Sequence, residues 1–247
     1  MGINMSRYWN IGKFSQPSVE ELRRRAAEST KSAAKKGKAL EPAVPVNRRG
    51  DICVSWWGRA WCENLERYAD YASRIERGKT YVRSGTVVDL KIAKGRVTAR
   101  VQGSRKTPYK VEIRISPLSE ENCQKIIEKC GRKISNMEKL VNGEFPEELK
   151  ELFTGDGGLF PTPREISCNC SCPDWALMCK HVAAAMYGIG VRFDENPFFF
   201  FNLRGIDVDR FIDVTLESRV ESMLANADCR SSRIIEDADL TSLFGVL

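Results

Sequence analysis

The chain has 247 residues, of which 42% are hydrophobic and 29% are charged, and its net charge is +6. A chain of this length can bury the core of one large domain or two small ones. No apolar run approaches the roughly 18 residues of a membrane span. The N-terminus lacks the apolar stretch of a secretory signal. We therefore expect neither a membrane protein nor a secreted one, and the nine cysteines favour reduced thiols in the cytoplasm.

Residues 1–50 are predicted to form a basic N-terminal arm that is partly disordered. Ser18 can cap a helix with Glu20 and Glu21 in its first turn. The segment has no broad apolar stripe, so this helix is expected to be exposed. Three consecutive arginines are candidate contacts to a polyanion, with an ordinary solvated tail as the other interpretation: Arg23, Arg24 and Arg25.

Residues 51–118 are predicted to contain a helix and then an antiparallel sheet. Ser55 opens the helix, and apolar residues recur every three or four positions up to an expected end near Gly78: Trp57, Trp61, Leu65, Tyr68, Ala72 and Ile75. The tryptophans of this segment either anchor the core or offer a surface on which bases stack.

The sheet is predicted from three alternating runs at 88–92, 97–101 and 111–115, joined by a turn at Lys94-Gly95 and a loop over 103–108. Its apolar face is expected to pack on the tryptophan helix. Its other face is either an ordinary solvated surface or a nucleic-acid contact, and would show Lys91, Arg100, Lys110 and Arg114, with Arg105 and Lys106 in the loop.

Residues 119–165 are predicted to be a helical connector. Ser119 can cap a helix in which Cys123 and Cys130 lie on the apolar stripe as small buried residues. A short helix at about 146–153 follows. Further on, residues 180–187 are expected to form a helix stopped by Gly188 and Gly190, and residues 206–247 an acidic tail that is helical over about 208–225.

The most specific motif contains the only histidine of the chain. It reads C-x-C, six residues, then C-x-H, and it brings three thiols and one imidazole into twelve residues: Cys170, Cys172, Cys179 and His181. This is a complete ligand set for a closed, tetrahedral zinc site, so we expect one zinc ion per chain. Cys168 forms a second C-x-C with Cys170. We prefer the 170/172 register because its loop closes more compactly, with Cys168 as a neighbouring or exchangeable thiol.

The motif resembles the SWIM zinc finger, and the likeness extends over residues 5–207. Further segments resemble prokaryotic SWIM proteins: Trp56-Trp57-Gly58-Arg59-Ala60-Trp61, Leu65-Glu66, residues 77–81, residues 101–105, Pro108-Tyr109, Pro197-Phe198 and residues 203–205. The resemblance implies zinc binding through Cys170, Cys172, Cys179 and His181, interaction with DNA or protein, and association with Swi/Snf-type helicases. The expected fold class is α+β, with an antiparallel β-meander packed on a Trp-rich helix, then a helical segment and a zinc knuckle (166–205) that ends in a helix.

The charges indicate where a nucleic acid would bind. Residues 1–50 carry eleven basic against four acidic residues, and residues 51–116 carry fourteen against seven. Residues 117–247 carry fourteen basic and twenty-two acidic residues. A polyanion is therefore expected at the first half of the chain, and the zinc knuckle, which lies in the acidic half, is expected to shape a docking surface for protein.

An enzyme is the least expected class of function. A closed zinc site has no open position for an activated water, and a metal-bound His181 leaves no histidine for a nucleophile–base pair. The favoured hypothesis is an adaptor whose basic half contacts DNA or RNA without sequence preference and whose zinc-finger half docks a protein such as a Swi/Snf-type helicase. The alternative is a purely protein–protein adaptor. No membrane partner is expected, and the expected location is the cytoplasm or the nucleoid within it.

Overall fold

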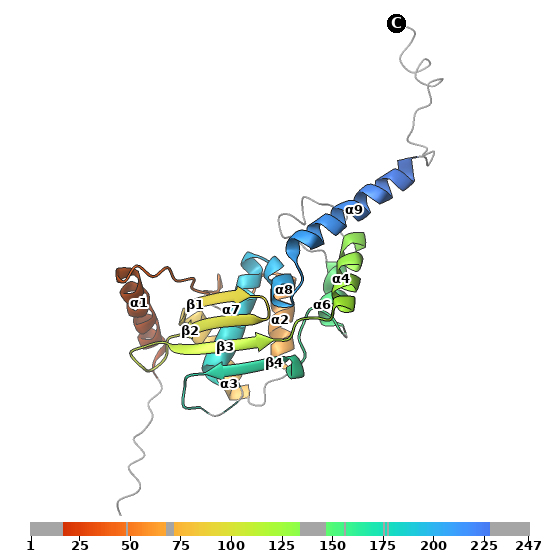
Figure 1. Ribbon diagram of the computed structural model, residues 1–247. Coiled ribbons are helices and arrows are strands. Elements are labelled where there is room, and N and C mark those ends of the chain that lie inside the picture. Colours follow the sequence, from red (N-terminus) through yellow and green to blue (C-terminus); the bar gives the residue numbers. More distant parts are fainter. Residues whose placement is uncertain are drawn as a thin grey trace, which may run out of the picture.

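The computed structural model describes residues 17–47, 49–67, 72–133, 147–155, 157–174, 176 and 178–227. Within these ranges no helix has both the length and the apolar character needed to cross a membrane. The helices and strands (Figure 1) are α1 (Val19–Lys35), α2 (Trp56–Glu66), α3 (Ala72–Arg83), β1 (Val87–Ala93), β2 (Arg96–Val101), β3 (Tyr109–Ile115), α4 (Glu120–Lys133), α6 (Lys150–Thr154), β4 (Ile166–Cys170), α7 (Lys180–Glu195), α8 (Phe198–Leu203) and α9 (Val208–Ala227), with 3₁₀ turns at Glu147–Leu149 and Pro163–Glu165.

The four strands form one antiparallel sheet in the order β1-β2-β3-β4. The predicted α+β class and the meander of β1, β2 and β3 are confirmed. β4 was not predicted as a strand, and it pairs along β3 from Ile115–Ile166 to Val111–Cys170. The zinc knuckle is therefore part of the sheet, because Cys170 is the last residue of β4, the fourth strand of the same sheet.

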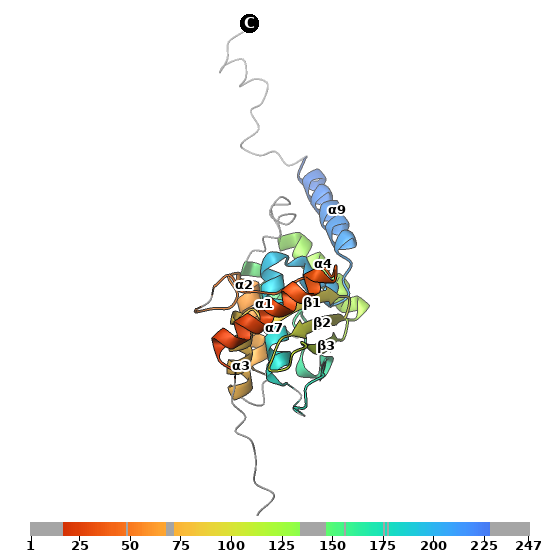
Figure 2. The same ribbon diagram turned by 90° about the vertical axis from the view of Figure 1, so that its left-hand side faces the viewer.

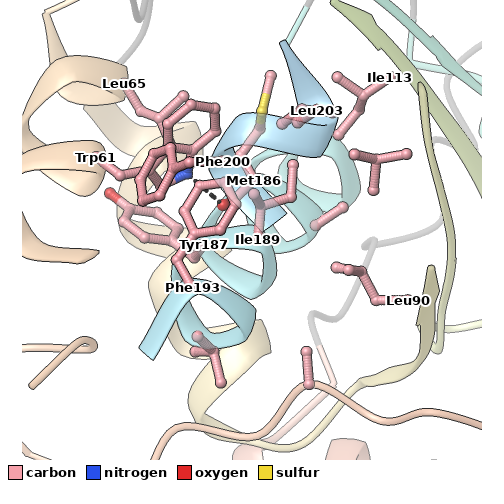
Figure 3. Packing of buried hydrophobic residues seen from close by; sticks show 14 of the residues in the cluster. Trp61, Leu65, Leu90, Ile113, Met186, Tyr187, Ile189, Phe193, Phe200 and Leu203 are labelled. Atoms are coloured by element: carbon pink, nitrogen blue, oxygen red, sulfur yellow. Dashed lines mark hydrogen bonds between the residues drawn. The ribbon is translucent and has the colours of Figure 1, made fainter. Parts of the chain in front are cut away.

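Helix α7 is the central element, and it lies between the sheet and the Trp-rich α2 (Figure 3). Leu90 and Ile113 of the sheet face α7 from one side, and Trp61 of α2 packs on it from the other. The Trp61 indole donates a hydrogen bond to the carbonyl of Met186 at 3.0 Å. The arrangement differs in this respect from a meander packed directly on the tryptophan helix. The reason is that α7 is apolar around its whole circumference, so it must be covered on every side.

Two glycines inside α7 allow this close covering. Gly188 and Gly190 were expected to end the helix, but α7 continues through both to Glu195. A Cβ at Gly188 would lie 2.9 Å from the Cδ1 of Leu90, and one at Gly190 would lie 2.8 Å from the Sγ of Cys53. These glycines are therefore positions of close packing rather than helix ends.

Gly78 has the same role where α3 packs on α7. The expected single helix from Ser55 to Gly78 is two helices, α2 and α3, and Gly78 lies inside α3. A Cβ at Gly78 would be 2.5 Å from the Cβ of Ala183 and 3.1 Å from its carbonyl carbon. Residues 68–71, which include Tyr68, lie outside the described part of the chain.

The described part of the predicted N-terminal arm belongs to the folded body. Ser18 caps α1 as expected, accepting a hydrogen bond from the amide of Glu21 at 3.1 Å, but Leu22 and Ala26 are buried against the body rather than exposed. The following segment runs beside β1, where the amide of Leu90 donates to the carbonyl of Glu41 at 2.8 Å. Figures 1 and 2 show α1 at the end of the sheet where the β2–β3 loop lies. Residues 1–16 are outside the described range.

Helices α4 and α9 lie at the opposite end of the molecule. α4 begins after Ser119, as predicted, with Cys130 buried and Cys123 half-buried on its packed face. α9 packs on α4 near its start and then extends away from the sheet (Figure 1). Its bounds agree with the helix predicted over 208–225.

Candidate metal centre

The four predicted ligands meet where β4 ends and α7 begins. Cys170 is the last residue of β4, Cys172 follows in the turn, and Cys179 is the N-cap of α7 with His181 in its first turn. Their ligand atoms all lie within 4.8 Å of one another. The Nδ1 of His181 is 3.9 Å from the Sγ of Cys170 and 3.9 Å from that of Cys179. Zinc bonds of about 2.0–2.3 Å set edges of about 3.5–3.8 Å in a tetrahedron, so the four atoms fit one zinc ion.

The histidine ring is held in place by aromatic neighbours. The ring of Tyr109 stacks on it with centroids 4.1 Å apart, and Tyr81 meets it edge-on at 5.5 Å. Nδ1 faces the thiols, while Nε2 is buried without a hydrogen-bond partner among the described residues. A Cβ on Gly103 would lie 2.9 Å from Nε2, so the absence of a side chain at this position leaves space for the imidazole ring of His181.

The thiols differ in how readily they give up a proton. Hydrogen bonds from Cys170 and His181, with the amide of Val182 at 3.5 Å, outweigh burial and lower the pKa of Cys179 to about 4. The pKa of Cys170 is raised, chiefly because its thiol donates to Cys179 and is partly buried. One thiolate is therefore already stabilised at the start of α7, where helix amides favour negative charge, and zinc, which binds thiolates, would stabilise the rest.

Cys168 lies beside the ligand cluster and not in it. It is on the same face of β4 as Cys170, because side chains two residues apart in a strand point the same way. Its thiol is not among the four clustered ligand atoms. Burial, with the nearby Cys179 charge, raises the pKa of Cys168 to about 12. The geometry therefore favours the 170/172 register.

The loop between the two ligand pairs is tied to α3. Arg74 forms an ion pair with Asp174 at 3.1 Å, and Asp174 also accepts a hydrogen bond from the amide of Ala176 at 3.2 Å. The Nζ of Lys180, the residue between Cys179 and His181, lies 6.0 Å from the ring centre of Tyr81. Trp175, in the same loop of the sequence, lies outside the described residues.

A basic groove of about 620 Å³ lies between α1 and the β2–β3 loop. We use the name basic groove for the cleft lined by these two segments, by residues 36–40 and by the adjoining ends of β1 and β2. Among the described residues Glu28 is the one carboxylate in its lining, and it is paired with Arg24 at 2.9 Å. The cations of the lining are Arg24, Arg25, Lys36, Lys38, Arg100, Arg105 and Lys106.

The structure divides the nine basic residues predicted as nucleic-acid contacts. Five line the basic groove: Arg24, Arg25, Arg100, Arg105 and Lys106. Arg23 is exposed on α1 outside the lining, and Lys91, Lys110 and Arg114 lie on the sheet. Lys91 pairs with Glu41 at 3.5 Å, and Arg114 pairs with Glu112 at 3.0 Å, which partly neutralises the sheet face.

Two cations of the basic groove, Lys36 and Lys38, were not predicted individually as nucleic-acid contacts. The sequence did not indicate which other element the segment after α1 packs against. The contact of Tyr109 and Gly103 with the metal ligand His181 was also missed. Both residues lie in segments that resemble SWIM proteins, 101–105 and 108–109. The resemblance therefore contained the signal, but only the fold shows that these segments surround the histidine.

Comparisons with known proteins agree with the site. The family model described as SWIM zinc finger matches residues 154–188. Uncharacterized protein Rv2102 of Mycobacterium tuberculosis is 36% identical over 182 residues, which is 73% of this chain and 65% of that protein. The chain thus matches slightly less than two thirds of this relative's length. No solved structure matches the chain.

The matched segment begins before β4 and ends within α7. It contains the strand end, the turn and the helix start that bring the three thiols and the imidazole together. Sequence spacing, geometry and family model therefore agree that residues 154–188 of this chain form a SWIM zinc finger.

Proposed function

We propose that this chain is a non-catalytic, zinc-binding adaptor that holds nucleic acid in the basic groove and docks a protein partner. The observation that carries the proposal is the groove itself. It joins cations from α1, the segment after it and the β2–β3 loop, and Arg100, Arg105 and Lys106 have no carboxylate partner among the described residues. Unpaired cations along a cleft favour a phosphate backbone and give affinity without sequence preference.

A cleft with basic residues from both α1 and the β2–β3 loop suits a single strand better than a duplex. Phosphates of one strand can meet cations on either side of the groove, whereas a duplex presents its phosphates on a convex surface. Apolar atoms of Leu40, Val88 and Pro108 in the lining offer contacts to bases. RNA and DNA single strands share this chemistry, and their 2′-hydroxyl is the difference to be tested.

The non-catalytic part of the proposal rests on the ligand set. Three thiols and one imidazole would fill a tetrahedral zinc, which leaves no position for a reacting water. The only histidine of the chain has its Nδ1 directed at the thiols. We also propose that the protein acts in the cytoplasm or on the nucleoid, where thiol ligands stay reduced.

The test is a salt titration of oligo-dT, oligo-U and duplex DNA binding by fluorescence anisotropy. The triple variant Arg100→Ala, Arg105→Ala, Lys106→Ala should lose most of the binding, and the slope of log K against log salt should fall by about 2, as expected for three lost phosphate contacts to a single strand. The matched control removes three exposed lysines at the far end, Lys125, Lys129 and Lys150. Equal loss in both variants, or no binding at low salt, would contradict the proposal.

A second candidate function, a purely protein–protein adaptor, is favoured by α9. Apolar side chains follow one side of its outer half at helical spacing and are 41–67% exposed: Leu216, Val220, Met223 and Leu224. Such a stripe is typical of a helix that binds in a groove of another protein. By resemblance, a Swi/Snf-type helicase is the partner to test.

The two candidates are separated by a pull-down with that helicase together with the nucleic-acid titration. Leu216→Glu with Val220→Glu should abolish capture if α9 is the docking element, while the groove variant should leave capture intact. A chain that captures the helicase but binds none of the three nucleic acids would be the purely protein–protein adaptor.

A further inference from the structure

The β2–β3 loop lies between the metal centre and the basic groove. On its inner side, Gly103 and Tyr109 contact the ring of His181. On its outer side, Arg105 and Lys106 line the groove. The loop therefore shares residues with both sites, although His181 is far from it in the sequence.

Three contacts connect the ring of Tyr109 to the groove. The guanidinium of Arg105 lies over the Tyr109 ring, 5.1 Å from its centre. The hydroxyl of Tyr109 is 3.5 Å from that of Ser104, and the carbonyl of Ser104 accepts a hydrogen bond from Arg25 of α1. Tyr109 thus touches the metal ligand on one face, while its neighbours join the two sides of the groove.

Two hydrogen bonds join the segment of Cys170 and Cys172 to Lys110, the residue after Tyr109. The amide of Ser171, between Cys170 and Cys172, donates to the carbonyl of Lys110 at 3.0 Å. The amide of Lys110 donates to the hydroxyl of Ser171 at 2.9 Å. The residue that follows Tyr109 is therefore fixed by the segment that carries two of the thiols.

We propose that zinc at the Cys170, Cys172, Cys179 and His181 centre positions the β2–β3 loop, so that zinc and single-stranded nucleic acid bind cooperatively. The proposal rests on the proposed function of the groove and names its regulation. With zinc bound, the imidazole is fixed in the orientation on which Tyr109 stacks, and Arg105 is held over the groove. Without the ion, the ring and the cysteine turn lose their common anchor, and the loop must be ordered when nucleic acid binds.

Cooperativity between two sites is reciprocal, so each ligand raises the affinity of the other by the same factor. The first measurement is the affinity of fluorescent oligo-dT for zinc-loaded and chelator-stripped protein. The second is the affinity of the protein for zinc, by competition with a chromophoric chelator, with and without saturating oligo-dT. We expect zinc to strengthen oligo-dT binding by about 5-fold or more, and oligo-dT to strengthen zinc binding equally.

Two variants distinguish the effect of the Tyr109 contact from effects on the metal centre or the basic groove themselves. Tyr109→Leu keeps an apolar residue in β3 but removes the stacked ring, so the zinc-loaded variant should bind oligo-dT as weakly as stripped protein of native sequence. The control is Lys38→Ala, a groove cation outside the loop. It should weaken oligo-dT binding by the same factor in both metal states and leave the cooperativity unchanged.

The outcomes are distinct. Circular dichroism establishes whether the stripped protein keeps its fold, and Tyr109→Leu tests the connection in zinc-loaded protein in either case. If oligo-dT binds zinc-loaded protein well and Tyr109→Leu has no more effect than Lys38→Ala in that state, the cooperativity proposal is wrong and the proposed function stands. If zinc-loaded protein binds none of oligo-dT, oligo-U and duplex DNA at low salt, both are wrong.

Discussion

At the scale of single residues, the metal site combines ligands from one short segment with aromatic rings from two distant segments. The ligands Cys170, Cys172, Cys179 and His181 were all readable from sequence, because they lie within one short segment. The rings that pack on the histidine were not readable, since Tyr81 and Tyr109 reach it only through the packing of α3 and β3. Local chemistry is visible in a sequence pattern, whereas contacts across elements require the fold.

The ligand register gives a first prediction. Cys168→Ser should keep one zinc per chain, because this thiol is outside the cluster, and Cys172→Ser should lose it. Native mass spectrometry of the two variants, with protein of native sequence as reference, measures the zinc content. Loss of zinc from Cys168→Ser with retention in Cys172→Ser would show that the 168/170 register is the true one.

A second prediction concerns the buried Arg204. Its side chain is 2% exposed and pairs with Glu165 at 2.6 Å. Glu165→Gln would leave this charge without its partner and should destabilise the fold by about 2–3 kcal/mol. Glu195→Gln, which breaks the more exposed pair with Arg192, should cost less than about 1 kcal/mol. Denaturant unfolding of both variants compares them, and similar costs would count against a special role for Arg204.

The ion pair of Glu165 with Arg204 also predicts that the stability of the fold depends on pH. Although burial opposes it, hydrogen bonds from Thr162 and Arg204 hold the pKa of Glu165 below its usual 4.5. The unfolded chain therefore takes up this proton at higher pH, so the stabilisation is present above about pH 4.5 and is lost as the pH falls through the folded pKa. The acid-induced loss of stability should be smaller in Glu165→Gln, as measured by melting temperature against pH.

At the scale of elements, strand alternation and helix starts were predictable, and helix ends were not. β1 to β3, Ser18 and Ser55 follow local rules of periodicity and capping. Gly78, Gly188 and Gly190 did not end helices, because tertiary packing required residues without a side chain there. A glycine in a sequence does not reveal whether it marks a chain turn or a close contact.

The contact of α3 with α7 gives a prediction at this scale. Alanine at an ordinary helical glycine stabilises by about 1 kcal/mol, but Gly78→Ala should destabilise by about 1–3 kcal/mol because its Cβ would meet Ala183 at 2.5 Å. Adding Ala183→Gly should recover part of this loss. Thermal unfolding of the single and double variants measures both effects, and a stabilised Gly78→Ala protein would exclude close packing here.

At the scale of the whole molecule, the predicted separation into a basic arm, a sheet and a zinc knuckle differs from the structure. The described part of the arm packs on the body, and the finger is part of both sheet and core, because β4 is an edge strand of the sheet and α7 lies in the core. The separation of basic and acidic halves along the chain suggested that the finger lies apart from the basic surface. In space, His181 touches the loop that lines the basic groove.

This integration predicts how the protein melts. Since α7 contacts every strand of the sheet and helices α2 and α3, removing zinc should lower the temperature of one cooperative transition. A finger that folded apart from the sheet would instead give a separate transition. Differential scanning calorimetry of loaded and chelator-stripped protein distinguishes the two, and an unchanged main transition after stripping would contradict the prediction.

The short span of the metal ligands also bears on the order of events during folding. Bringing together four groups within twelve residues closes only a short loop, which costs little chain entropy. Pairing β3 with β4 joins residues much farther apart and is correspondingly slow. A nascent chain can thus bind its zinc ion before the sheet is complete, so that the metal orders the ligand segment early in folding. Because the unfolded chain then also holds zinc, the ion stabilises the native state by less than its full binding affinity.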